Sequence, residues 1–104
     1  MGETKKIDIA NNLKIVEWLK AELLDSVAAL YKSLLKTGND IKGDALARII
    51  IIAYLLGRRV GVPFEITDMQ VKNKLGNSID KSEELGQWQG DLSDLLQYLE
   101  KRKR

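Results

Sequence analysis

The chain contains no cysteine and no histidine, and it has a single proline in 104 residues. These absences exclude disulfides, thiolate nucleophiles, serine–histidine triads and zinc sites of the Cys/His type. Any catalysis would therefore rest on carboxylates, lysine, arginine, serine or tyrosine. Magnesium or manganese with oxygen ligands remains available, because these ions need only Asp and Glu side chains.

A strong excess of charge of one sign is also missing, since the net charge is +2. So small a charge indicates neither a nucleic-acid partner nor binding to a membrane surface. Residues 1–6 are not followed by the apolar run of a signal peptide, and the most apolar segment is too short to span a bilayer. We therefore expect a cytoplasmic protein without a membrane or nucleic-acid partner.

Helical periodicity runs through most of the chain. Residues 7–36 lack proline and glycine and predict one long helix, or two in tandem, from about Asp8 to Lys36, before Gly38. A third helix is expected over 64–75, closed by Gly76, and one or two more over 78–98, interrupted near Gly86 and Gly90. The stripe expected to face the core in the first helix consists of Leu13, Val16, Leu23, Val27, Leu30 and Leu34.

The segment 44–60 is the most apolar part of the sequence. Arg48 is the only charged residue between Ala45 and Gly57. Four consecutive isoleucines suit a buried strand, but no other segment offers a partner strand, so a helix is favoured. Asp44 suits the start of this helix, and its end is expected near 60–61.

A helix that is apolar around most of its circumference is normally buried on several sides. A chain of this size has few other elements to cover it, so we expect a homodimer or higher homo-oligomer, with Ile51 in the buried surface. The predicted fold is one all-α domain over 1–104, a bundle of four to five helices completed by dimerisation. Its core is expected at 8–76, followed by a helical segment at 78–100 and a basic tail at 101–104.

Two acids on the first helix, Glu22 and Asp25, stand three residues apart and so project to the same side. They could be a pair of metal ligands facing a second helix, or part of a solvated surface, which is the more frequent role of such pairs. Asp91 and Asp94 share the spacing, but Asp91 follows a glycine as a helix-start residue does. Asp44 is likewise open to two interpretations, a metal ligand or a charge at a helix N-terminus.

The order of these features resembles the MazG-like, all-α nucleotide pyrophosphohydrolase family. That family has an E-E-x-x-E/D element on one helix, E-x-x-D on the next, and an apolar helix that ends in leucine, basic residues and glycine. Here the corresponding segments are Ala-Glu-Leu-Leu-Asp at 21–25, Asp-Ala-Leu-Ala at 44–47, Tyr-Leu-Leu-Gly-Arg-Arg-Val-Gly-Val at 54–62 and Val-Lys-Asn-Lys-Leu at 71–75. Alanine replaces one acid of each element, at Ala21 and Ala47.

The resemblance implies Mg²⁺- or Mn²⁺-dependent hydrolysis or binding of nucleoside triphosphates. In the family, clustered carboxylates hold the metal, and a metal-activated water releases pyrophosphate and the monophosphate. By resemblance the metal ligands would be Glu22, Asp25 and Asp44. Phosphate would be contacted by Lys72, Lys74 and Arg58, and Trp18 would form a wall of the base pocket.

The replaced acids leave open whether the chain is an enzyme. The alternative is a catalytically inactive MazG-like protein that serves as a dimeric interaction or regulatory module. A third interpretation is a DNA-binding helix-turn-helix around 56–61, but Thr67 stands where that motif has an apolar residue, and the net charge is low.

The sequence also predicts how the missing acid could be restored. Residue 47 lies about one helical turn after Asp44, so Ala47→Asp should project toward the same side. On a working scaffold this variant is expected to bind Mn²⁺ more tightly and to release more pyrophosphate, measured by metal titration and a pyrophosphate assay. Lower melting temperature without either gain would indicate that the site is lost.

Overall fold

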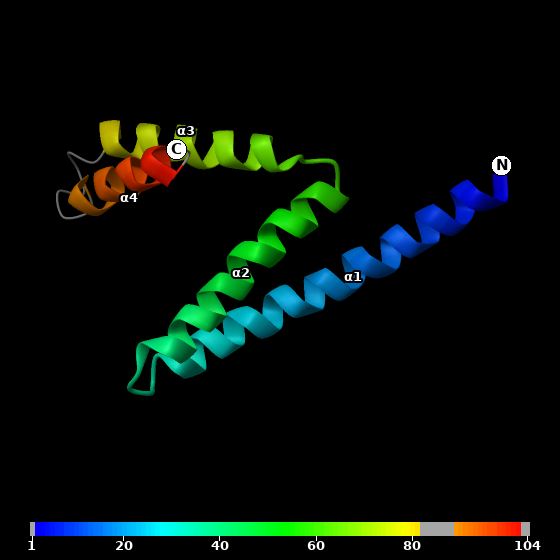
Figure 1. The fold of residues 1–104 in the computed structure, drawn as a ribbon, viewed down its shortest axis with the longest axis horizontal. Helices are drawn as coiled ribbons and strands as arrows, with labels where there is room; N and C mark the ends of the chain where they lie inside the picture. The colour runs from blue at the N-terminus through cyan, green and yellow to red at the C-terminus, as the bar shows by residue number, and fades with distance from the viewer. Residues whose placement is uncertain (1, 82–88, 103–104) are drawn as a thin grey trace. The chain divides into compact units, whose positions relative to one another are not determined.

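The computed structural model describes residues 2–81 and 89–102 of the chain. No β-strand occurs in these ranges, which confirms the all-α fold. The described chain divides into two compact units, 1–64 and 65–104, and each is considered by itself. The four helices are α1 (Gly2–Ser33), α2 (Asn39–Arg59), α3 (Phe64–Lys81) and α4 (Gln89–Arg102) (Figure 1).

Helix α1 is longer at its start than the sequence pattern indicated. It begins at Gly2, so the predicted start at Asp8 is wrong. Residues 3–6 include one Glu and two Lys, which have high helix propensity and favour a helix in this segment. It ends at Ser33, whose hydroxyl donates a hydrogen bond to Leu30 O at 2.6 Å.

Helix α2 begins earlier than predicted, at Asn39, directly after Gly38 with φ 115°. Asp40 is the acid of its first turn, and Asp44 lies one turn further in, so the prediction that Asp44 opens the helix is wrong. Gly38 explains this difference, because a positive φ lets the chain reverse sharply and start the second helix at once.

The C-terminal end of α2 is where the sequence placed it. Val62 N–H donates to Gly57 O at 2.8 Å and Gly61 N–H donates to Arg58 O at 3.2 Å. These two bonds form a Schellman motif, which satisfies the last carbonyls of the helix and needs a left-handed residue. Gly61 provides that residue, with φ 96°.

Helices α1 and α2 form an antiparallel hairpin that is the main body of the first unit (Figure 1). Its contact line is a series of buried residues spaced seven apart, as in packed helix pairs. Asn12 and Arg59 close the line at the open end, where two hydrogen bonds of 3.3 Å join them. The buried members are Leu19, Ser26 and Ser33 on α1, and Ala45 and Ile52 on α2.

This line differs from the stripe predicted for α1. Leu13 and Leu34 are each 60% exposed in the structure, so they are not core residues of the unit. Ser26 and Ser33 lie in the contact line itself and are buried. Their small side chains let the two helices approach closely. The larger apolar residues lie beside the line instead.

The contact line divides the hairpin into two sides. An ion pair joins Glu22 of α1 to Arg48 of α2, so both residues lie on the same side of the contact line. This pair shows which face of α1 adjoins which face of α2 on that side. Asp25 and Asp44 share this side by their helical positions, and we call it the charged side. The opposite side, which we call the apolar side, carries Ile9, Leu13, Val27, Tyr31 and Leu34 of α1, and Leu46, Ile49 and Ala53 of α2.

In the second unit, α4 returns beside α3 (Figure 1). Leu75 is buried here, and Lys72 Nζ of α3 lies 3.5 Å from Glu100 Oε1 of α4. Helix α3 continues through Gly76 to Lys81, so the predicted end at Gly76 is wrong. Gly90 lies in the first turn of α4, next to the first-turn acid Asp91, and does not interrupt a helix. The interruption expected near Gly86 falls outside the described residues.

None of the helices, over the described ranges, has the length and apolar character that a membrane span requires.

Two glycines of the hairpin give a matched test of these backbone assignments. Gly61→Ala is expected to lower stability by about 1 kcal/mol, because alanine is strained at positive φ. Gly43→Ala, in the interior of α2 with open space around the new Cβ, is expected to raise stability by about 0.5–1 kcal/mol. Thermal or urea unfolding followed by circular dichroism measures both, and equal effects of one sign would contradict the assignment.

Candidate functional site

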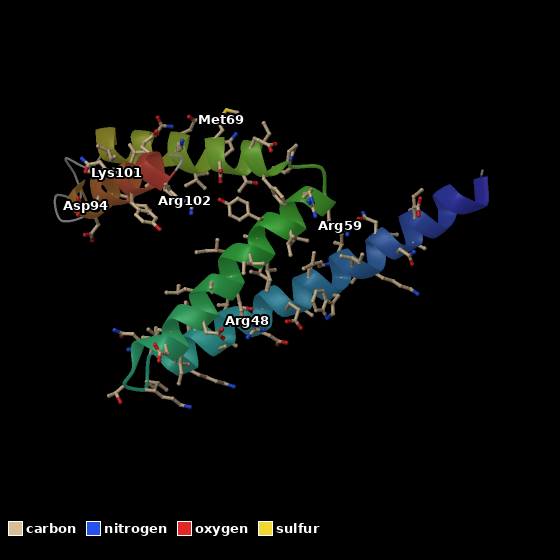
Figure 2. All side chains as sticks on the ribbon, viewed as in Figure 1. Arg48, Arg59, Met69, Asp94, Lys101 and Arg102 are labelled. Atoms are coloured by element: carbon tan, nitrogen blue, oxygen red, sulfur yellow. The ribbon has the colours of Figure 1, made fainter. Side chains whose placement is uncertain are left out.

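The charged side of the hairpin is the part of the structure that brings together predicted site residues. Arg48 Nη2 donates to Glu22 Oε2 at 3.2 Å, and the two side chains are 40% and 29% exposed. Figure 2 shows Arg48 lying between α2 and α1. This ion pair joins residues 26 positions apart and links the two helices on this side.

Two further predicted ligands, Asp25 and Asp44, lie on the same side and are exposed. Asp25 follows Glu22 by three residues, and Asp44 precedes Arg48 by four, so each acid lies about one turn from a member of the ion pair. Among the residues that the structure describes, however, no group of three or more acids is arranged to hold a metal ion.

The arrangement does not fit a divalent cation at Glu22. Magnesium needs oxygen ligands at close to octahedral geometry, and manganese likewise favours oxygen donors. The carboxylate that would be its first ligand is already hydrogen-bonded to a guanidinium, and that positive charge would repel a cation placed there. Binding of metal by Glu22, Asp25 and Asp44 remains a prediction from the family resemblance.

Trp18 lies on the charged side of α1, one turn before Glu22, and is 60% exposed. It is available as the flat wall that was expected for a base pocket, although no contact defines such a pocket. Ile51, on the same side of α2, is 56% exposed. The expectation that a second copy of the chain buries Ile51 stays a prediction, and Ile51 is exposed within one copy as such a surface requires.

The arginines at the end of α2 have local partners. The guanidinium carbon of Arg58 lies 4.6 Å from the centroid of the Phe64 ring, which is a cation–π contact. Tyr54 packs edge-on against the same ring, at 5.8 Å between centroids. Phe64 therefore fixes Arg58 beside the turn that ends α2, and the expected contact of Arg58 with phosphate remains untested.

The predicted phosphate-binding lysines lie in the second unit. Lys72 is paired with Glu100, as described above, whereas Lys74 is exposed on α3. Both residues are on helix α3 as the sequence indicated. Their role toward phosphate stays a prediction.

The model of the MazG-like family matches residues 9–92. The chain belongs to the MazG-like family. Membership makes this MazG-like protein a relative of the nucleotide pyrophosphohydrolases. No curated protein and no solved structure matches the chain.

The sequence reasoning missed the residue that decides the character of the charged side of this MazG-like protein. Arg48 was noted only as an interruption of an apolar segment. Its isolation was the available signal, because a charged residue within an apolar helix is normally paired with an opposite charge. Glu22, about three turns before the end of α1, could not be identified as its partner without the register of the hairpin.

The strength of the link can be measured by a double-mutant cycle with Glu22→Gln and Arg48→Met. Both side chains are partly exposed, so solvent screens the pair and a coupling of about 0.5–1 kcal/mol is expected. The same cycle on Glu17 and Lys20, which are 3.1 Å apart and 70% and 57% exposed, should give a smaller value. Urea unfolding supplies both couplings, and zero coupling at Glu22 would contradict the pair.

Proposed function

We propose that this MazG-like protein is a non-hydrolytic helical module that acts as a homodimer formed through the apolar side of its α1–α2 hairpin. The ion pair between Glu22 and Arg48 supports the first half of the proposal most directly. An enzyme of the resembled type needs its carboxylates free to ligate a cation, and here an arginine from the facing helix binds one of them.

The composition of the apolar side supports the second half. A helix pair alone buries only one stripe of each helix, and stable domains add a further layer to cover the remaining apolar surface. In the first unit the buried apolar residues are few, namely Leu19, Ala45 and Ile52. The larger residues on the apolar side remain exposed, including Ile9 at 62%, Leu13 at 60%, Tyr31 at 69%, Leu34 at 60% and Leu46 at 47%.

The spacing of the apolar residues on α1 also supports packing against a second copy of the chain. Leu13, Val27 and Leu34 belong to one row with a seven-residue repeat, which is the pattern of a second helix-packing seam. Lys20 lies in the same row between Leu13 and Val27, and it pairs with Glu17 on its own helix. Its aliphatic stem can lie along apolar neighbours while the charged end stays in water. Two hairpins packed by these rows would form a four-helix bundle.

Hydrolysis of nucleoside triphosphates is the second candidate function. It is favoured by family membership and by the location of Glu22, Asp25 and Asp44 on one side of the hairpin. This candidate requires the arginine–glutamate pair to open and the three acids to draw together. The two candidates therefore differ in a measurable activity.

The dimer is tested by two substitutions of similar chemistry on opposite sides of α2. Leu46→Asp places a charge on the apolar side and is expected to dissociate the protein, because an unpaired charge in an apolar interface costs several kcal/mol. Ile51→Asp introduces the same charge on the charged side and should leave the oligomer intact. Sedimentation velocity at micromolar concentration measures both.

A wild-type monomer at micromolar concentration would contradict the dimer. Dissociation by Ile51→Asp with an intact Leu46→Asp oligomer would place the interface on the charged side instead.

The catalytic half is tested by pyrophosphate release. The wild-type protein with Mg²⁺ or Mn²⁺ and each of the common nucleoside triphosphates is expected to show no release above a protein-free control. Release that is lost in Glu22→Gln would overturn the proposal in favour of the hydrolase.

A further inference from the structure

We infer that Arg48 takes the place of a divalent cation in this hairpin: its guanidinium supplies the positive charge that Glu22 requires and ties α1 to α2 without metal. This inference deepens the proposed function and rests on it, because a non-hydrolytic module needs the two helices joined but needs no reactive metal.

The first step of the argument is where the positive charge lies. The Nη2 atom of Arg48 is 3.2 Å from Glu22 Oε2, and this bond crosses from one helix to the other. A cation bound by carboxylates of two helices has the same two effects. It neutralises the acids, and it holds the helices together. An arginine does both with a charge that is permanent at physiological pH.

The second step is the balance of charge on this side. Three acids lie near the ion pair. Glu22 is part of it, Asp25 is about one turn from Glu22 on α1, and Asp44 is about one turn from Arg48 on α2. Arg48 lowers the repulsion among these acids where the two helices meet. If Arg48 became an acid, four carboxylates would lie on the same side and none would have its present counter-ion. That arrangement has the charge and the oxygen donors that bind Mn²⁺.

The third step identifies position 48, and not position 47, as the place of the missing acid. Arg48 reaches Glu22, whereas Ala47 is exposed and lies about 100° away around the helix. The sequence predicted that an acid at position 47 would restore the site, whereas the structure favours position 48. An acid at 47 would point away from α1, and an acid at 48 would face Glu22.

The experiment is a comparison of full-length variants by isothermal titration with Mn²⁺ and by thermal unfolding with Mn²⁺ or EDTA. The wild type is expected to show no change of melting temperature with either additive. Arg48→Asp is expected to have a lower melting temperature in EDTA and to regain it with Mn²⁺. Its affinity for Mn²⁺ should be at least about tenfold higher than that of the wild type, a difference of about 1.4 kcal/mol.

Two controls separate a specific site from general attraction of cations. Arg58→Asp makes the same change of charge ten residues further along α2, about 15 Å away, and should gain no Mn²⁺ affinity. Ala47→Asp should gain much less than Arg48→Asp. If Arg48→Asp is unfolded in EDTA, Mn²⁺ should restore its helical circular dichroism.

Three results would overturn the inference. The first is a rise of the wild-type melting temperature with Mn²⁺ equal to that of Arg48→Asp. The second is an equal gain of affinity in Arg58→Asp. The third is a failure of millimolar Mn²⁺ either to stabilise or to refold Arg48→Asp. None of these results depends on pyrophosphate release or on the oligomeric state, so the inference and the proposed function can fail separately.

Discussion

The close contact between α1 and α2 is the constraint on which the rest of this MazG-like protein depends. Its central places hold small residues, Ser26 and Ser33 on α1 and Ala45 on α2. Serine hydroxyls in such a place need hydrogen-bond partners, and both donate to carbonyls of their own helix, Ser26 at 2.8 Å and Ser33 at 2.6 Å. The contact is therefore tight and leaves no buried polar side-chain atom unsatisfied in the part of the chain that is described.

A fixed register gives the hairpin two chemically different sides. Leu19 of α1 and Ile52 of α2 are both buried in the contact line. Because side chains about one turn apart project the same way, these two positions also determine the side on which every other residue lies. Glu22 and Arg48 then meet, and the acids at 25 and 44 flank them. Many of the exposed apolar residues lie on the opposite side, among them Leu13, Leu34 and Leu46, whereas Trp18 and Ile51 lie on the charged side. One packing arrangement thus gives the hairpin a side with an ion pair and a side with a row of exposed apolar residues.

The charged side places an arginine among the acids that the family resemblance names as metal ligands. Glu22, Asp25 and Asp44 share one side of the hairpin, but no three acids among the described residues are arranged to hold a metal ion. Family membership makes the chain a relative of the nucleotide pyrophosphohydrolases. Arg48 binds one of these acids, and its positive charge would repel a cation placed beside Glu22. The fold and the reaction are separable, because the fold depends on the contact line and the reaction on a few side chains beside it.

The sequence by itself determined the helical character of the chain, the end of α2 at its glycine turn, and the family. These depend on local periodicity, on the backbone freedom of Gly61 and on residues close together along the chain. Local patterns did not determine the start of α1 or the end of α3. Helix α1 begins before Asp8, at Gly2, and α3 continues beyond Gly76 to Lys81. Only the tertiary structure decided which stripe of α1 is buried, since its apolar and small-residue faces overlap and the facing helix chooses between them. It alone paired Glu22 with Arg48, because a contact between residues 26 positions apart depends on the register of two helices and leaves no periodic signal in either one.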